Sequence, residues 1–131
     1  MHVASCQCGA VTAACAGEPV RVSVCHCLAC QRRSGSAFAA QARFAAADVV
    51  TSGEPATWQR RGDEGSVATF RFCATCGSTV WYSADSEPDL IAVALGAFAD
   101  PHAFGPPIYS VYETRKFAWL TVDAPGMDHY D

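Results

Sequence analysis

Seven of the eight cysteines in this 131-residue chain fall into three tight clusters, and this arrangement constrains the fold more than any other feature. Two clusters are pairs, Cys6-Gln7-Cys8-Gly9 and Cys73-Ala74-Thr75-Cys76-Gly77, and the third is the triplet Cys25-His26-Cys27-Leu28-Ala29-Cys30. Four thiolates around a tetrahedral zinc ion make a closed structural site, whereas three protein ligands leave a position for water or substrate. The four cysteines of the two pairs and the three of the triplet therefore predict one zinc that stabilises the fold and one that takes part in chemistry.

A glycine directly follows each cysteine pair, and the triplet lacks one. Gly9 and Gly77 allow a positive φ, so the chain can turn its backbone N–H groups toward the sulfurs. Such a ligand turn at the end of a strand is typical of a zinc knuckle, and two facing knuckles complete one four-thiolate site. The triplet ends in Cys30-Gln31-Arg32-Arg33, which indicates a different kind of site.

Disulfide bonds are the alternative use for eight cysteines in a short chain. The N-terminus, Met-His-Val-Ala-Ser-Cys, lacks the basic start and apolar stretch of a secretory signal. The longest apolar stretch, Leu90 to Ala99, is too short to span a bilayer. We therefore expect a cytoplasmic protein in a reducing compartment, where clustered cysteines are more often metal ligands. Cys15, outside the clusters, is expected to pack in the core.

The net charge and the length of the chain limit its possible functions and its number of domains. The chain has 9 basic and 13 acidic residues, a net charge of −4, which argues against nucleic-acid binding because that favours a basic face. Eight of the nine basic residues are arginine, the side chain best suited to bidentate carboxylate recognition. The length predicts a single domain, residues 1–131, with a modest core helped by metal.

Short β-strands separated by Gly- and Pro-containing turns dominate the pattern. The expected strands are Val3–Ser5, Ala10–Ala16, Val20–Val24, Ala37–Phe44, Val49–Thr51, Ala56–Arg60, Val67–Phe72, Thr79–Ser83, Leu90–Ala94, Ile108–Glu113 and Ala118–Val122. Their spacing predicts an all-β, mainly antiparallel sandwich or tent rather than βαβ units. Helix is limited to about one turn after Cys27 and another at Ala45–Asp48. The tail, Asp123 to Asp131, is expected to be irregular.

Three stretches carry a resemblance to a known family. They are Cys6-x-Cys8-Gly9-Ala10-Val11, Cys25-His26-Cys27-x-x-Cys30-Gln31-Arg32-x-Ser34-Gly35-Ser36-Ala37-Phe38 and Arg71-Phe72-Cys73-x-x-Cys76-Gly77-Ser78. With these, and with Gly96 to Asp100 and Pro107 to Trp119, the chain resembles the glutathione-dependent formaldehyde-activating family, which also includes centromere protein V. The resemblance spans nearly the whole chain. It implies a zinc-stapled all-β fold similar to the Mss4 β-tent, with little helix.

The resemblance also implies roles for the cysteines. Carried over by position, the structural zinc would be held by Cys6, Cys8, Cys73 and Cys76, and the catalytic zinc by Cys25, Cys27 and Cys30. This agrees with the division that the glycines indicate. The family's named activity joins glutathione to formaldehyde to give S-hydroxymethylglutathione, formally a carbon–sulfur lyase reaction. We therefore expect two zinc ions per chain and glutathione as co-substrate.

The chemistry of a three-thiolate zinc site fits a role in thiol activation. Its net charge of about −1 makes the zinc a weak Lewis acid, poorly suited to making hydroxide from water. It is well suited to a soft thiol as fourth ligand, because coordination deprotonates the thiol. The thiolate can then attack a small carbonyl carbon. On this interpretation the three cysteines are metal ligands and the nucleophile belongs to the substrate.

The residues around the triplet are candidates for substrate contacts. Arg32 and Arg33 follow it directly and are suited to glutathione carboxylates, with solvated loop arginines as the alternative. His26 lies between two ligands, and in an extended segment its side chain points away from both. A proton-transfer or outer-sphere role for His26 is a secondary hypothesis. Core or cleft-wall positions are expected for Trp58, Trp81 and Trp119.

Two other functions compete with the enzyme hypothesis. A non-enzymatic zinc module that binds a protein predicts that the second zinc is absent, or that a fourth protein ligand such as Cys15 or His26 closes its site. Nucleic-acid binding in the manner of centromere protein V is disfavoured by the acidic balance and the lack of a basic tail. The preferred hypothesis is an enzyme whose partners are a small-molecule thiol and aldehyde, with no nucleic-acid or membrane partner.

Overall fold

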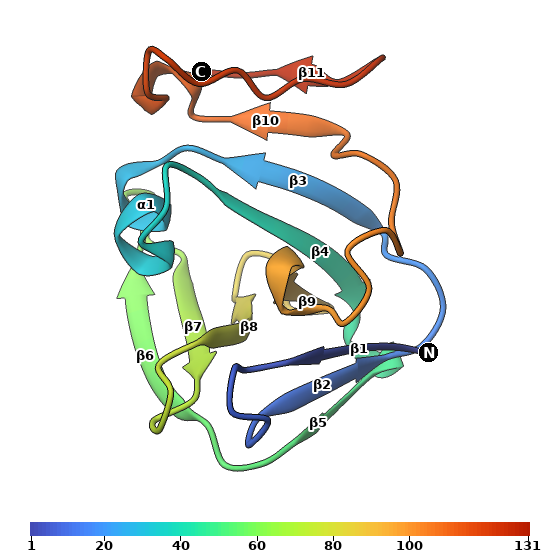
Figure 1. The fold of residues 1–131 in the computed structure, drawn as a ribbon. Helices are drawn as coiled ribbons and strands as arrows, with labels where there is room; N and C mark the ends of the chain where they lie inside the picture. The colour runs from blue at the N-terminus through green and yellow to red at the C-terminus, as the bar shows by residue number, and fades with distance from the viewer.

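Eleven β-strands form two sheets in a computed structural model that describes residues 1–131 (Figure 1). The smaller sheet has the order β1-β2-β5 and consists of β1 (His2–Ser5), β2 (Thr12–Cys15) and β5 (Val49–Ser52). The larger sheet has the order β11-β10-β3-β4-β9-β8-β7-β6. Its strands are β3 (Arg21–Cys25), β4 (Ala39–Ala45), β6 (Ala56–Arg61), β7 (Val67–Phe72), β8 (Thr79–Ala84), β9 (Leu90–Ala94), β10 (Tyr109–Val111) and β11 (Asp128–His129). The prediction of an all-β fold with little helix is confirmed.

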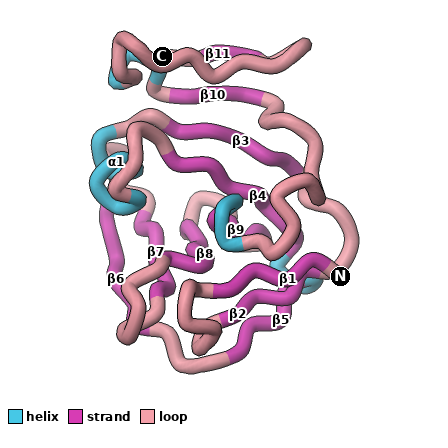
Figure 2. The backbone as a smooth tube through the Cα atoms, viewed as in Figure 1, coloured by secondary structure: helices cyan, strands magenta, loops and turns pink.

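Helix is confined to one α-helix and three short 3₁₀ turns. The tube view shows how little of the backbone is helical (Figure 2). The α-helix is α1 (Leu28–Ser34), and the turns are η1 (Ala46–Asp48), η2 (Leu95–Ala97) and η3 (Glu113–Arg115). Both helical segments predicted from the sequence are therefore present, at α1 and η1. None of these helices is long and apolar enough to cross a membrane.

Most neighbouring strands are antiparallel, but β10 runs parallel to both β3 and β11. A long connection, residues 95–108, follows β9 and leads to β10, which pairs with the edge of β3 that β4 does not occupy. No hairpin joins β10 to either neighbour. A long crossover is what a parallel pair requires. The mainly antiparallel expectation therefore holds for the body of the fold, and its C-terminal edge is mixed.

The sequence prediction is wrong at two places near the C-terminus. Ala118–Val122 forms no strand, and β11 lies instead in the tail that was expected to be irregular. The backbone N–H of Leu120 turns back to the carbonyl of Phe117, and the ring of Trp119 packs against Phe117 at 5.4 Å between centroids. Apolar residues in this segment thus contact one another locally, while β11 pairs with β10.

The main hydrophobic core lies where the small sheet packs on the large one. Its twelve buried residues come from both sheets and their loops: Ala4, Cys6, Val11, Ala13, Cys15, Val22, Ala42, Phe44, Cys73, Val80, Val93 and Phe98. Cys15 is fully buried there, so its predicted packing role is confirmed. A second, smaller cluster contains only Cys25, Cys30 and Ala39. One member of each cysteine pair therefore belongs to the main core, and the triplet does not.

Candidate metal centres and the adjoining cleft

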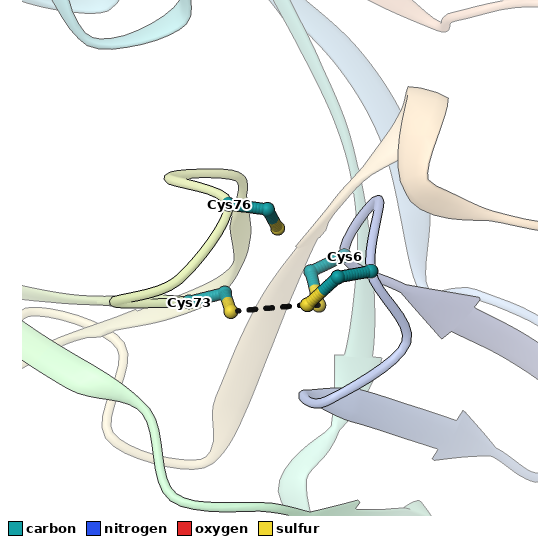
Figure 3. Close-up of side chains that lie close together, drawn as sticks. Cys6, Cys73 and Cys76 are labelled. Carbon is teal, nitrogen blue, oxygen red and sulfur yellow. Dashed lines mark hydrogen bonds between the residues drawn. The ribbon is translucent and has the colours of Figure 1, made fainter.

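The two cysteine pairs meet in space although 65 residues separate Cys8 from Cys73. All four sulfurs, from Cys6, Cys8, Cys73 and Cys76, lie within 4.8 Å of one another. Figure 3 shows side chains from the two loops pointing toward one another. Cys8 Sγ lies 3.7 Å from Cys6 Sγ and 3.6 Å from Cys73 Sγ. Zinc–sulfur bonds of about 2.3 Å give tetrahedral sulfur–sulfur edges of about 3.8 Å, so the cluster has the size of a zinc site.

Tight turns direct backbone N–H groups at these sulfurs. Gly9 and Gly77 have φ values of 85° and 80°, the left-handed conformation predicted for the knuckle glycines. The N–H of Val11 donates to Cys6 Sγ at 3.3 Å and lowers the pKa of that thiol. The backbone N–H of Ser78 similarly lowers the pKa of Cys76 to about 5. Both turns thus favour the thiolate, the form that binds metal.

The triplet sits where β3 passes into α1. Cys25 ends β3, Cys27 caps the N-terminus of α1 by accepting the N–H of Cys30 at 3.3 Å, and Cys30 lies in the first turn. Their sulfurs lie within 4.8 Å of one another. Contacts with Cys25 and then Cys30 lower the pKa of Cys27 to about 2, and the contact with Cys27 raises the pKa of Cys25. Soft, closely spaced sulfurs of this kind suit zinc.

No fourth cysteine, histidine or carboxylate joins the triplet in the structure. Cys15 is in the main core. His26 is fully buried, but its Nε2 hydrogen-bonds Ser110 Oγ at 2.9 Å on β10, and its Nδ1 has no hydrogen-bond partner. The backbone N–H of His26 donates to the carbonyl of Val111. His26 therefore attaches the triplet segment to β10 rather than completing the metal site.

A cleft of about 550 Å³ opens beside the triplet, between α1 and the strands β6 and β7. The curvature of the large sheet brings β6 close to α1, although β6 and β3 are far apart in the strand order (Figure 1). The lining of the cleft consists of Ala29, Cys30, Arg32, Arg33, Thr57, Trp58, Arg60, Phe70, Phe72 and Thr79. Three of the eight arginines are in this set and no acidic residue is. The cleft is thus locally cationic in an acidic protein, which suits an anionic ligand.

The two arginines singled out from the sequence occupy different positions. Arg32 is exposed and lines the cleft. Arg33 is half-buried, with its guanidinium carbon 5.1 Å from the ring centroids of both Phe70 and Tyr82. Its Nη2 lies 4.0 Å from Cys30 Sγ. Both residues lie in α1 rather than in a loop, and Arg32 is the more solvated of the two.

Arg60 is a charged cleft residue that the sequence alone did not indicate. It follows Trp58 by two positions on β6, so both side chains belong to the same face of that strand. The pairing of Trp58 with Phe70 on β7 then sets the aromatic wall of the cleft. Alternation along β6 was a usable signal, but nothing local placed that strand beside the triplet.

The three tryptophans have different surroundings. Trp58 lines the cleft, which confirms the expected core or cleft-wall position for this residue. Trp81 packs under the guanidinium of Arg71, 4.6 Å from its ring centroid. Trp119 is 74% exposed and lines a shallow groove on another side of α1 together with Leu28 and Phe117. The expected core or cleft-wall position is therefore wrong for Trp119, which lies in neither the core nor the cleft beside the triplet.

Comparisons with known proteins bear on the fold and on the family of the chain. The crystal structure of a Rhodobacter sphaeroides protein is similar with a TM-score of 0.59 and 20% sequence identity, over 98% of this chain and 99% of that one. At this identity the likeness shows the fold alone. No curated protein gives a significant match. A family model described as "Glutathione-dependent formaldehyde-activating enzyme" matches residues 1–115. The chain therefore belongs to the glutathione-dependent formaldehyde-activating enzyme family.

Proposed function

We propose that this protein is a zinc-dependent enzyme of the carbon–sulfur lyase type, which forms or cleaves the adduct between a thiol and a small aldehyde. Glutathione is the proposed thiol and formaldehyde the family's prototype aldehyde. One observation carries the proposal: a three-cysteine cluster without a fourth protein ligand meets, at Cys30, a cleft lined by arginines. The proposal takes residues 1–131 as a single domain that acts in the cytoplasm.

The cysteines divide into two proposed zinc sites. We assign the structural zinc to Cys6, Cys8, Cys73 and Cys76, and the catalytic zinc to Cys25, Cys27 and Cys30. The sulfur spacing and the donor chemistry of both clusters fit zinc. Zinc at the triplet would supply a position for a soft fourth ligand and would lower the pKa of a thiol bound there.

The protein's own side chains would bind and orient the substrate. Arg32 and Arg60 offer fork-shaped donors to carboxylates at the cleft surface, and Arg33 lies deeper beside Cys30. Trp58 and Phe70 form an apolar wall along one side of the cleft. The substrate sulfur attacks the carbonyl carbon of the aldehyde, the C=O π pair moves to oxygen, and the thiol proton ends on that oxygen. The reverse sequence cleaves the adduct.

The alternative is a non-enzymatic zinc module that binds a protein. That hypothesis predicted that the second zinc is absent, or that a fourth protein ligand such as Cys15 or His26 closes its site. Both of these side chains have other partners, in the core and on β10 respectively. The open cleft beside the triplet favours the enzyme.

Thiol binding to the cobalt-substituted protein tests the proposal. Cobalt in a sulfur-rich site gives charge-transfer and ligand-field bands that change when a fourth thiolate binds. We expect reduced glutathione to change the bands of the triplet site and S-methylglutathione to bind much more weakly, because a thioether cannot become a thiolate. The S-methyl compound keeps the same peptide contacts, so it is the matched control.

Proton exchange spectroscopy tests turnover directly. With formaldehyde present, the zinc protein should accelerate the interconversion of free and hydroxymethylated glutathione. Unchanged cobalt bands at saturating glutathione, together with no rate acceleration, would favour the binding-module hypothesis instead.

A further inference from the structure

We propose that Arg33 is a positioning residue of the triplet centre, which stabilises the Cys30 thiolate and favours an anionic sulfur as its fourth ligand, and that it is not a contact for substrate carboxylates. The inference rests on the proposed function and assigns different roles to the adjacent residues Arg32 and Arg33. Arg32 would contact the body of the substrate, and Arg33 would act on the reacting centre through Cys30.

The helix places Arg33 next to Cys30. The two residues are three positions apart on α1, so their side chains lie on the same helical face. The guanidinium Nη2 is 4.0 Å from Cys30 Sγ, within reach of a long N–H···S hydrogen bond. Arg32, one position earlier, is exposed.

Aromatic side chains hold this guanidinium in place. Its carbon lies 5.1 Å from the ring centroids of Phe70 and Tyr82, within the range of cation–π contacts. A second guanidinium, that of Arg43, lies 6.0 Å from the Tyr82 centroid, so the ring contacts two cations. Because Phe70 and Tyr82 belong to β7 and β8, the sheet fixes the position of a side chain carried by α1.

Arg33 has no carboxylate partner in the protein. The ion pairs of the structure involve Arg21, His2 and His129, and none involves Arg33. A half-buried cation without a carboxylate needs another source of negative charge. Cys30 Sγ, 4.0 Å from the Arg33 Nη2, would supply that charge as a metal-bound thiolate.

Charge balance explains what this contact would do. Three thiolates and one divalent metal ion carry a net charge of about −1, and a fourth thiolate would bring it to about −2. The guanidinium offsets one of these charges at short range, in a half-buried site where screening by water is reduced. It therefore favours a thiolate over a neutral fourth ligand, whatever the rest of the thiol molecule contains.

Two thiol probes separate the two arginines in the cobalt-substituted protein. Glutathione carries carboxylates and 2-mercaptoethanol does not. We expect Arg33→Met to weaken binding of both thiols by roughly 10- to 100-fold, the range typical of outer-sphere partners of metal ligands. Arg32→Met should weaken glutathione binding and leave the affinity for 2-mercaptoethanol within about twofold. Arg33→Lys should restore part of the lost affinity, because it keeps the charge but loses the planar fork.

A second readout does not depend on added thiol. An N–H···S contact lowers the energy of the sulfur lone pairs, so Arg33→Met should shift the cobalt charge-transfer bands to lower energy, whereas Arg32→Met should not. Circular dichroism and two cobalt ions per chain would establish that each variant is folded and loaded.

The outcomes distinguish this inference from the proposed function. If Arg33→Met loses affinity for glutathione alone and its cobalt bands are unchanged, Arg33 is a carboxylate contact and the inference is wrong. If the wild-type protein binds neither thiol, the proposed function fails. A band shift in Arg33→Met would then still support its placement at Cys30, and unchanged bands would overturn that placement too.

Discussion

The two cysteine centres differ less in their sulfurs than in what surrounds them. Each contains two buried cysteines, and in each the sulfurs lie within 4.8 Å of one another. Cys6 and Cys73, however, belong to a core of twelve buried residues, whereas Cys25 and Cys30 share a cluster with Ala39 alone. The four-cysteine centre joins two loops to the main core, and the triplet lies at the margin beside a cleft. Surroundings of this kind suit one centre to stability and the other to chemistry.

The supports of the two centres also differ. The four-cysteine centre is held by the turns after β1 and β7, whose strands pack in the body of the fold. The triplet depends on β3, α1 and the short C-terminal strands, through the contacts of His26 with Ser110 and Val111 on β10. Substitutions at the C-terminal edge should therefore weaken metal binding at the triplet more than at the four-cysteine centre.

The largest expected effect comes from breaking the four-cysteine centre. Cys73→Ser should unfold or aggregate the protein, because the binding energy of a structural zinc, about 10–16 kcal/mol, is part of its folding energy. Cys27→Ser is the matched change in the triplet and should leave a folded protein with about one zinc fewer. Circular dichroism and zinc stoichiometry measure both. Unfolding of Cys27→Ser combined with a folded Cys73→Ser would reverse the assignment.

A large effect is also expected where the chain passes closest to the first knuckle. At Gly53 (φ 88°), an added Cβ would lie 1.9 Å from the carbonyl oxygen of Ala10, next to the turn at Gly9. Gly53→Ala should therefore lower the free energy of unfolding by roughly 2 to 5 kcal/mol, from backbone strain plus steric overlap. Gly65→Ala is the control, because Gly65 has a φ of 89° and no atom within 4 Å of the added Cβ.

Chemical denaturation compares these two glycine variants. Gly65→Ala should cost about 1–2 kcal/mol, from the positive φ alone. Equal losses of stability in the two variants would show that the contact between Gly53 and the knuckle segment does not matter.

An intermediate effect is expected at the support of the triplet. Ser110→Ala removes the partner of the buried His26 Nε2 and should cost about 1–3 kcal/mol of unfolding free energy. Metal titration should show weaker binding at the triplet and unchanged binding at the four-cysteine centre. Ser52→Ala, at an exposed serine in β5, is the control and should change neither property. Equal weakening of both metal sites would contradict a support specific to the triplet.

The smallest expected effect depends on pH and concerns the C-terminal edge. His129 on β11 lies between two carboxylates, with Nδ1 2.8 Å from Glu113 Oε2 and Nε2 3.1 Å from Asp123 Oδ1. Glu113 and then Asp123 raise the pKa of His129, and His129 lowers the pKa of both carboxyls. The stabilisation by these charged pairs is therefore complete between the ordinary carboxyl pKa values of about 4 and the ordinary histidine pKa of about 6.5. It is lost as the pH rises through the raised pKa of His129, and also as the pH falls through the lowered carboxyl pKa values.

His129→Gln should consequently lower the melting temperature slightly near pH ~5.5 and leave it almost unchanged near pH ~9. His102→Gln is the control, because the His102 imidazole makes no hydrogen bond or ion pair, and the backbone N–H of His102, which donates to Asp100 Oδ1, is kept in the variant. This control should show no such pH dependence. A loss of stability in His129→Gln that stays constant across this pH range would rule out the charged pairs as its cause.

Much of the fold could be predicted because it follows local rules. Alternation and turn residues placed the strands Val67–Phe72 and Leu90–Ala94 where the structure has them. The segment Ala118–Val122 was predicted wrongly as a strand, because local apolarity does not show whether a neighbouring strand edge is within reach. The parallel pairing of β10 with β3 also could not be predicted from the residues of these strands, because it depends on the path of the chain through residues 95–108.

The candidate site also combines features that follow from local sequence with features that depend on the tertiary structure. Cysteine spacing and the glycines after each pair by themselves determined the grouping of the sulfurs and the positive φ at Gly9 and Gly77, because ligand turns are set within a few residues. Only the tertiary structure decided that β6 and β7 face α1, that Arg60 joins the cleft, and that the Arg33 guanidinium lies beside Cys30 and against two neighbouring aromatic rings. Those contacts depend on the curvature of an eight-stranded sheet, which arises from the pairing of all its strands rather than from any one segment.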